Sequence, residues 1–336
     1  MRLSNNLVIL DVSPFIYTGE NSASTEPPRV KQFPVKGINY FLKFLSAELV
    51  NCCDMILCFD SASFRKSIDT NYKANRSHNA NVSAQLELLY TYLPKYGFTC
   101  LKQEGVEADD IIFTCVEKYK RKYRNIDIYT ADKDICHNVG PNVNCLAVNS
   151  NTVDVYKHTY EDLLGVPYNT ISASKLFKGD RSDNIPPFSP NAQELFEQYI
   201  SLLRKLDQIT PEMAKTKEFM YKAIDVVYTQ LFDEKKVNEL RKRVELIYPK
   251  KVEFDFDYEP CSYSSIDKLK FASFLYTLGN TVSLQALGLD GSWDKSLESY
   301  LQRMGDSLCK GFYAIDNSII ENCEKMNMDS FMLRGF

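Results

Sequence analysis

The sequence lacks the long apolar runs and the cysteine patterns that mark several protein classes. No segment approaches the ~20 apolar residues that cross a bilayer, and the first apolar stretch, Leu7 to Leu10, runs into Asp11 and is too short for a signal peptide. The ten cysteines contain no CxxC pair. We therefore expect a soluble cytoplasmic protein, without a membrane partner, whose cysteines are reduced and mostly buried.

An excess of positive charge and a zinc-binding pattern are missing as well. The 40 Lys and Arg residues against 44 Asp and Glu give a net charge of -4, so an anionic polymer would have to bind where basic residues gather on one surface. The three histidines, His78, His137 and His158, lack the spacing of zinc ligands. We expect all three at the surface.

What the chain does contain is an alternation of short apolar runs with helical patterns. Five runs are predicted as strands: Leu7 to Leu10, Met55 to Phe59, Phe98 to Leu101, Ile126 to Tyr129 and Val143 to Val148. Three segments between them are predicted as helices: Ile38 to Val50, Val82 to Leu93 and Ala108 to Tyr123. This alternation indicates the α/β class, with a mostly parallel central sheet flanked by helices. Residues 149–151 are predicted as the turn of a terminal hairpin whose second strand is Thr152 to Tyr156.

After about residue 170 the strand patterns stop. Helices are predicted over residues 192–206, 211–232, 233–248 and 266–278. We accordingly expect an α/β core in residues 1–170, a helical lobe in residues 171–305 and a carboxyl-terminal extension in residues 306–336.

Carboxylates follow each of the first four predicted strands. Asp11 ends the first strand, Asp60 ends the second, and Asp132 with Asp134 follows the fourth. The helix after the third strand begins with three acids, namely Glu107, Asp109 and Asp110. Because a ligand crevice in an open parallel sheet lies beyond the carboxyl ends of its strands, these acids are predicted to meet at one edge. Two more acids, Asp180 and Asp183, open the helical lobe and are expected to close over that edge.

Each acidic group has an ordinary explanation when it is taken alone. Acids at a helix start complement the helix dipole by about 0.3–1 kcal/mol each, and acids after strands are common loop residues. That explanation does not account for acids after four successive strands. Two carboxylates ~4 Å apart repel by about 4 kcal/mol at an effective dielectric of 20, so a shared edge requires cations. Oxygen ligands without His or Cys favour Mg²⁺ or Mn²⁺, and two such ions are typical of phosphodiester hydrolysis.

The segment just beyond Asp60 supplies positive charge. Within residues 64–76, Arg65, Lys73 and Arg76 are expected to extend from the acidic edge, with Tyr72 available to stack on a base. A solvated charged helix is the alternative. Beside an edge that cleaves phosphodiesters, a cationic clamp is the better explanation.

Six sequence blocks together resemble the structure-specific 5′ nucleases, the flap endonuclease family that includes phage 5′ to 3′ exonucleases and the 5′ nuclease domain of bacterial DNA polymerases. The blocks are Leu-Asp at 10–11, Cys-Phe-Asp at 58–60, Tyr-Lys-Ala-Asn-Arg at 72–76, Glu-Ala-Asp-Asp at 107–110, Ala-Asp-Lys-Asp at 131–134 and Gly-Asp-Arg-Ser-Asp-Asn-Ile-Pro at 179–186. Their order and spacing agree over roughly the first 190 residues. Within the family, Phe-Asp-Phe-Asp-Tyr-Glu-Pro at 254–260 and the helix after it look like the carboxyl-terminal lobe of the T-even phage ribonuclease H branch.

The resemblance implies a PIN-like, Rossmann-like nuclease core with two metal ions and a degenerate helix-hairpin-helix lobe that binds DNA. It implies one ion among Asp11, Asp60, Glu107, Asp109 and Asp110. It implies a second ion among or near Asp132, Asp134, Asp180 and Asp183. It also implies that Lys73 contacts the scissile phosphate and that Arg76 assists.

One block departs from the family pattern. After Asn-Ile-Pro the family usually has a glycine-rich hairpin that binds a potassium ion and a duplex phosphate, whereas this chain reads Pro-Phe-Ser-Pro-Asn-Ala-Gln-Glu. Two prolines without N–H groups, and no glycine, argue against that backbone site. Duplex contacts are then expected from other basic residues, such as Lys120 to Arg124 or Arg241 to Arg243.

The leading hypothesis is a metal-dependent 5′ to 3′ exonuclease or flap endonuclease, acting as a monomer, that removes RNA primers and short flaps during viral replication. Its partners would be branched or nicked duplex DNA and RNA-DNA primers, with a single-strand-binding protein as a further partner. The apolar tail, Phe331, Met332, Leu333 and Phe336, either folds back on the helical lobe or docks on a sliding clamp. Two alternatives are a PIN-type single-strand ribonuclease, which is usually far shorter, and a non-catalytic protein that binds branched DNA, which would have lost acids.

Overall fold

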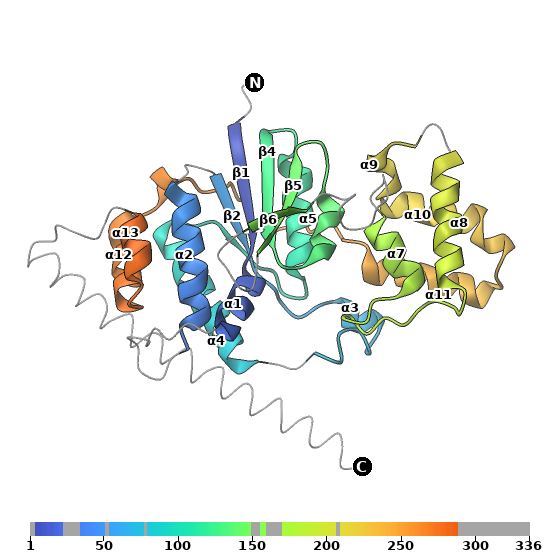
Figure 1. Ribbon diagram of the computed structural model, residues 1–336, viewed down its shortest axis with the longest axis horizontal. Helices are drawn as coiled ribbons and strands as arrows, with labels where there is room; N and C mark the ends of the chain where they lie inside the picture. Colours follow the sequence, from blue (N-terminus) through green and yellow to red (C-terminus); the bar gives the residue numbers. More distant parts are fainter. Residues whose placement is uncertain are drawn as a thin grey trace, which may run out of the picture.

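The computed structural model of the chain describes residues 4–22, 34–50, 54–76, 79–148, 155–158, 170–205 and 209–287. A six-stranded sheet with the strand order β3-β2-β1-β4-β5-β6 occupies the middle of these residues. Helices cover both faces of the sheet, and a second group of helices lies beyond one side of it (Figure 1).

The sheet is parallel except at one edge. Its strands are β1 (Ser4–Asp11), β2 (Asp54–Cys58), β3 (Cys100–Leu101), β4 (Tyr123–Thr130), β5 (Val143–Val148) and β6 (Val155–His158). The central strand β1 pairs in parallel with β2 and with β4, and its side chains from Leu7 to Leu10 are buried. A strand covered on both faces has apolar residues on both sides, which is why this stretch is continuously apolar. The predicted α/β class and mostly parallel sheet are therefore confirmed.

The predicted terminal hairpin is confirmed in its pairing. Strand β6 runs antiparallel to β5, with Val155 opposite Val148 and His158 opposite Cys145. The predicted strand from Thr152 to Tyr156 overlaps β6 only at its end. The predicted turn, residues 149–151, and the start of that strand lie outside the described residues.

Two layers of helices cover the sheet. One face carries α1 (Val12–Asn21), α2 (Lys36–Val50), α4 (Ala80–Tyr92) and the 3-10 turn η1 (Leu93–Tyr96). The other face carries α5 (Ala108–Tyr119), which buries Ile111, Ile112 and Cys115 and ends four residues before the predicted end.

Helix α1 was not predicted, because Pro14 and Gly19 interrupt its helical pattern. Pro14 lies in the first turn, where a missing N–H costs nothing. Gly19 allows α1 to approach α2 closely, since a Cβ there would lie 2.6 Å from Cβ of Tyr40.

The second group of helices forms a lobe with its own core. It contains α7 (Ile171–Lys178), α8 (Ala192–Lys205), α9 (Pro211–Ala214), α10 (Lys217–Val226), the 3-10 turn η3 (Tyr228–Gln230) and α11 (Glu234–Ile247). Phe177, Tyr199 and Leu240 are among its buried residues. The single helix predicted over residues 211–232 is wrong, because α9 ends at Ala214 and Thr216 caps the next helix, its side chain accepting a hydrogen bond from the Phe219 N–H.

The last described helices return to the α/β core. Helix α12 (Lys268–Thr277) and helix α13 (Thr281–Ala286) lie beside α2 on the side of the sheet opposite the helical lobe (Figure 1). Phe271 and Phe274 share the apolar cluster of α2 and α4. The buried core of the lobe itself extends from Ala173 to Tyr248. The predicted carboxyl-terminal extension, residues 306–336, lies outside the described residues.

No helix in the described part of the chain is long and apolar enough to span a membrane. Six cysteines are described as free thiols, and five of them are buried. This agrees with the reduced, buried state that was predicted for them.

Candidate active site

The carboxyl ends of β1, β2 and β4 bring three predicted acids to one edge of the sheet. Asp11 ends β1, and its Oδ2 accepts a hydrogen bond of 2.8 Å from Oγ1 of Thr130 at the end of β4. Oδ1 of Asp60 accepts a 2.9 Å hydrogen bond from the N–H of Ala108, which fixes the end of β2 to the start of α5. Asp132 caps the 3-10 turn η2 (Lys133–Asn138) that follows β4.

Asp109, in the first turn of α5, belongs to the same group. Burial and the carboxylates of Asp60 and Asp132 raise the pKa of Asp11 well above its ordinary value. Burial and the carboxylate of Asp132 do the same to the pKa of Asp109. These groups repel one another when ionised, so a cation bound among them would relieve the repulsion.

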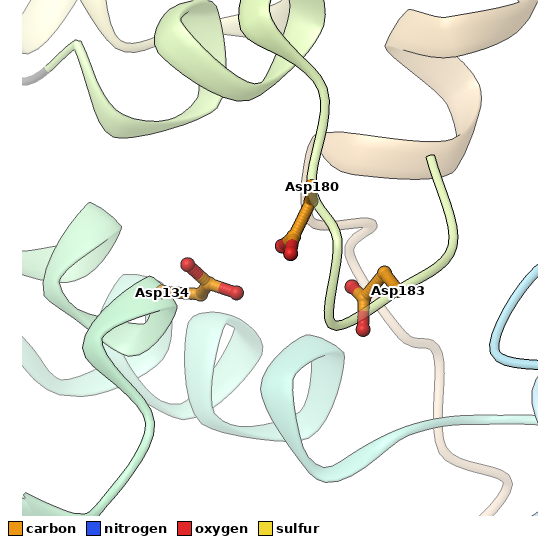
Figure 2. A group of neighbouring side chains, drawn as sticks. All are labelled: Asp134, Asp180 and Asp183. Carbon is orange, nitrogen blue, oxygen red and sulfur yellow. The ribbon is translucent and has the colours of Figure 1, made fainter. Parts of the chain in front are cut away.

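A second acidic group joins η2 to the turn that follows α7. Figure 2 shows Asp134 facing Asp180 and Asp183, and one carboxylate oxygen from each lies within 4.8 Å of the others. The turn is held by two 2.8 Å hydrogen bonds between the backbones of Asp180 and Ile185. Gly179 precedes it with φ +78, a conformation that favours glycine.

Lys175 lies in the middle of this second group and was missed by the sequence analysis. Its Nζ forms ion pairs with Asp134 and Asp180 and lies 3.9 Å from Oδ2 of Asp183. Burial and Asp132 nevertheless raise the pKa of Asp134 to about 6. Burial opposes ionisation of Asp180 too, but Lys175 and Ser182 together lower the pKa of Asp180 to about 2. The only sequence signal was a basic residue five positions before Asp180.

Arg65 and Tyr72, expected to contact nucleic acid, are instead buried beneath the acidic edge. NH1 of Arg65 donates to Oε2 of Glu107 at 2.7 Å, and only 3% of Arg65 is exposed. The Tyr72 hydroxyl donates to the same Oε2 at 3.2 Å, and its ring packs against Ile185 and Leu246. Neither side chain is open to a base or a phosphate in this arrangement.

Asp110 points away from Asp109 and toward Arg65. NH1 and NH2 of Arg65 donate to its two oxygens at 2.7 and 2.8 Å, and the N–H of Lys250 donates to Oδ1 at 2.8 Å. Asp109 and Asp110 are consecutive on a helix and so point in directions about 100° apart. The structure therefore brings Asp109 to the edge and directs Asp110 to Arg65.

Lys73 and Arg76 do lie at the acidic edge. Nζ of Lys73 forms an ion pair with Glu107 and lies 4.0 Å from Oδ1 of Asp183. NH2 of Arg76 lies 2.6 Å from the same Oδ1, and half of the Arg76 side chain is exposed. The backbone N–H of Lys73 donates to the Asp183 carbonyl at 2.9 Å, so this loop joins the core to the helical lobe.

Ion pairing also sets the charge of these groups. Burial alone would raise the pKa of Glu107, but Lys73 and Arg65 lower it to about 2. Burial likewise opposes the charge of Lys73, but Glu107, Asp109 and Asp183 raise the pKa of Lys73 above its ordinary value. Glu107 is therefore a carboxylate and Lys73 an ammonium ion at neutral pH.

One acid of the first group and two of the second line a small cavity. Its volume is about 40 Å³, and Asp109, Asp134 and Asp183 line it together with Lys175. The ligand atoms offered are carboxylate oxygens, which suit a hard divalent cation such as Mg²⁺ or Mn²⁺. The donor set therefore fits the predicted metals.

The altered hairpin after residue 186 is organised by a side chain. NH1 of Arg243, of which 7% is exposed, donates to the Pro186 carbonyl at 2.7 Å, and its guanidinium lies 5.3 Å from the Phe188 ring centroid. Arg243 is thus turned inward, whereas Arg241 is exposed and pairs with Asp225 at 2.7 Å.

The surface position predicted for His137 is wrong. Only 6% of His137 is exposed, and its Nδ1 lies 2.8 Å from Oγ of Ser172. The turn η2 directs the ring inward, between the rings of Phe113 and Tyr248. The side chains of His78 and His158 lie outside the described part of the structure.

Comparisons with known proteins agree with this arrangement. Residues 6–163 match the family model of the 5′-3′ exonuclease N-terminal, resolvase-like domain. A 5′-3′ exonuclease of Buchnera aphidicola subsp. Schizaphis graminum is 32% identical over 190 residues, which cover 54% of this chain and 64% of the relative. A 5′-3′ exonuclease of Aquifex aeolicus is 28% identical over 260 residues, which cover 71% of this chain and 88% of the relative. The chain thus spans less than two thirds of the first of these relatives.

Among solved structures, the catalytic core of Rad2 in complex with DNA substrate has a TM-score of 0.50 at 13% identity, over 87% of this chain and 93% of that chain. At this identity the likeness shows a shared fold alone. The match over residues 6–163 and the named relatives show more: this part of the chain matches the N-terminal, resolvase-like domain of 5′-3′ exonucleases.

Proposed function

We propose that this protein is a two-metal-ion 5′ nuclease that hydrolyses phosphodiesters of DNA and of RNA-DNA primers during replication. The observation that carries the proposal is the meeting of carboxylates from β1, α5, η2 and the turn after α7 beside the lysine and arginine of residues 72–76. A phosphate is attracted to such a site only when cations neutralise the acids. The match of residues 6–163 to the 5′-3′ exonuclease N-terminal domain supports the same chemistry.

Two Mg²⁺ or Mn²⁺ ions would be held by the acids that face the edge, namely Asp11, Asp60, Glu107, Asp109, Asp132, Asp134, Asp180 and Asp183. When bound, such ions supply Lewis-acid stabilisation of the negative charge that develops on the reacting phosphate. We assign Asp110 a different role from the one expected. Because Arg65 and the Lys250 N–H occupy its oxygens, Asp110 holds Arg65 and thereby positions Glu107.

Lys73 and Arg76 are proposed to contact the scissile phosphate. Lys73 keeps its proton because Glu107, Asp109 and Asp183 surround its ammonium group. With metal ions bound to those acids, Nζ of Lys73 would be free to donate to a phosphate oxygen as the negative charge of that oxygen grows. Arg76 is more exposed and suits an outer phosphate contact.

The helical lobe, predicted over residues 171–305, is proposed to bind duplex DNA. In the described residues its own core ends at Tyr248, so we place the duplex-binding surface within residues 171–248. The proposed sliding-clamp and single-strand-binding-protein partners rest on the sequence, since the apolar tail lies outside the described residues.

The test uses end-labelled 5′ flaps, nicked duplexes and RNA-primed duplexes with Mg²⁺, with Mn²⁺ and with EDTA. We expect cleavage from the 5′ side that EDTA abolishes. Asp132→Asn should lower the cleavage rate by about a hundredfold or more while DNA affinity is retained. Asp225→Asn, which changes an exposed acid of the helical lobe, serves as the matched control.

Three outcomes would reject the proposal. Cleavage of single-stranded RNA alone would identify the ribonuclease alternative. Binding of branched DNA without metal-dependent cleavage would identify the non-catalytic alternative. Cleavage by Asp132→Asn at the wild-type rate would show that the acidic edge is not the site.

A further inference from the structure

A large groove lies on the outer side of α5, between the core and the helical lobe. Its volume is about 870 Å³, and it is lined by α5, by the start of α10 and by residues 248–258, the strap that leads from α11 back to the core. Figure 1 shows α5 on the side of the sheet that faces the helical lobe. The residues that α5 contributes, such as Thr114 and Lys118, follow the acids of its first turn.

The strap is fixed along its length, so this wall of the groove is preformed. The N–H of Val252 donates to Oγ1 of Thr114 at 2.8 Å. Further along, the Tyr119 hydroxyl donates to the Tyr258 carbonyl at 3.0 Å, and Nζ of Lys118 donates to the same carbonyl at 2.7 Å. A ligand entering the groove would therefore meet an ordered surface and would not have to order it.

Three aromatic rings gather on the strap. Phe254, Phe256 and Tyr258 alternate with Asp255 and Asp257, and the chain bends at residues 255 and 256, which brings the three rings together. The Phe254 ring lies 5.3 Å from Phe256 and 5.1 Å from Tyr258, measured between centroids. Phe256 is nevertheless 48% exposed. The trio therefore holds one ring at the surface of the groove.

The charge of the groove is opposite to that of the chain. The whole sequence has a net charge of -4, yet six lysines and three carboxylates line the groove. Lys217 pairs with Glu245, and Lys120 pairs with Glu117. Lys250 and Lys251 are exposed, and within the described residues neither forms an ion pair, although Nζ of Lys250 lies 5.0 Å from the Phe64 ring centroid. These two are placed to meet an anionic ligand.

We propose that this groove binds a segment of single-stranded nucleic acid, with Phe256 stacking on a base and Lys250 and Lys251 pairing with phosphates. A single strand combines repeated negative charge with flat bases, and it is bound by lysines and exposed rings together. Phe256 is exposed and does not form the wall of an enclosed pocket. It therefore suits stacking on a flat base better than binding an apolar peptide side chain. The choice of nucleic acid as the ligand rests on the proposed function.

The experiment measures binding of fluorescent oligothymidylate to the full-length protein in EDTA, where cleavage does not occur. Phe256→Ala should weaken binding at least fivefold, because a stacked base contributes about 1–3 kcal/mol. Lys250→Ala/Lys251→Ala should weaken it as well and reduce the salt slope by about 0.7 for each lysine. Leu269→Ala and Lys268→Ala, exposed residues of α12, are the matched controls and should bind as the wild type does.

Two outcomes would overturn the proposal. One is that both groove variants bind oligothymidylate with the affinity and salt slope of the wild type and also melt at the wild-type temperature. The other is that the groove substitutions abolish binding of a labelled polyglutamate peptide but leave oligothymidylate binding intact. That result would identify an acidic peptide as the ligand. This binding assay contains no metal and does not measure cleavage. If the wild type fails to cleave in the separate assay with Mg²⁺ or Mn²⁺, the nuclease proposal is rejected and the binding result still stands.

Discussion

The guanidinium of Arg65 lies against the carboxylate of Asp110 in two hydrogen bonds of 2.7 and 2.8 Å, with both side chains almost fully buried. The same NH1 reaches Glu107 at 2.7 Å, so one cation holds the N-cap acid and an acid of the first turn of α5. NH2 also donates to the Tyr248 carbonyl at 3.3 Å, at the end of the helical lobe. Arg65 thus fixes Glu107 relative to both parts of the molecule.

This relationship predicts different consequences for two adjacent aspartates. Asp110→Asn should lower the free energy of unfolding by about 3 kcal/mol, because it breaks a buried ion pair. Asp109→Asn should cost little stability in EDTA, since it removes a carboxylate that Asp132 repels. By contrast, Asp109→Asn should lower the affinity for Mn²⁺ by about tenfold or more, which is a larger loss than that of Asp110→Asn. Urea unfolding and calorimetric Mn²⁺ titration measure the two effects, and the reverse order would refute the assignment of Asp110.

Lys73 and Arg241 are predicted to act at different stages of the reaction. Lys73→Ala should lower the single-turnover rate by about a hundredfold while affinity changes far less, because Lys73 meets charge that develops at the phosphate. Arg241→Ala should weaken binding and reduce the salt slope by about one unit. Asp225→Ala, which releases Arg241 from its ion pair, is the control and should not weaken binding. Equal effects of Lys73→Ala and Arg241→Ala on rate and affinity would contradict this division.

The acidic edge could be predicted because the pattern that carries it is local. Parallel strands end at one edge, so Asp11, Asp60 and Asp132 needed only the correct strand assignments. The family resemblance was predicted from the order of such blocks, and residues 6–163 match the 5′-3′ exonuclease N-terminal domain. The roles of the individual acids, and the closer likeness to T-even phage proteins, stay predictions.

Burial could not be read from the same blocks. Arg65 and Tyr72 stand in a polar segment that resembles an exposed clamp, but Arg65 is enclosed by groups as distant in sequence as Tyr248. Lys175 had no motif of its own, since its role depends on a turn that brings Asp134 and Asp180 around it. These contacts depend on tertiary packing, which neither periodicity nor spacing encodes.

Lys175 is predicted to act as an internal counter-ion for the second acidic group. Lys175→Met should lower the melting temperature in EDTA by a few degrees, because Asp134, Asp180 and Asp183 then repel one another. Added Mn²⁺ should raise the melting temperature more in the variant than in the wild type, since the metal no longer competes with an ammonium group. Lys178→Met on the same helix, whose Nζ lies 4.2 Å from the Phe196 ring centroid, is the control. If added Mn²⁺ raises the melting temperature of Lys175→Met and of Lys178→Met by the same amount, this role of Lys175 is wrong.

His137 is predicted to make the protein less stable in acid. Burial lowers the pKa of His137 to about 3, with a smaller contribution from Lys215. His137 is therefore protonated near pH 6.5 in the unfolded chain but stays neutral at that pH in the folded chain. The free energy of unfolding consequently decreases as the pH falls below 6.5. Between pH 7 and pH 5 the loss should be about 2 kcal/mol. The raised pKa values of Asp11, Asp109 and Asp134 act in the opposite direction, since the folded state takes up their protons first.

The histidine contribution is isolated by comparing the wild type with His137→Gln in urea unfolding at both pH values in EDTA, because the acidic groups contribute equally to both proteins. When the pH falls from 7 to 5, the free energy of unfolding of the wild type should decrease by about 2 kcal/mol more than that of the variant. An equal pH dependence in the two proteins would mean that His137 is protonated in the folded state. In that case the ring would have to be reached by water, and its place between Phe113 and Tyr248 would not be a closed one.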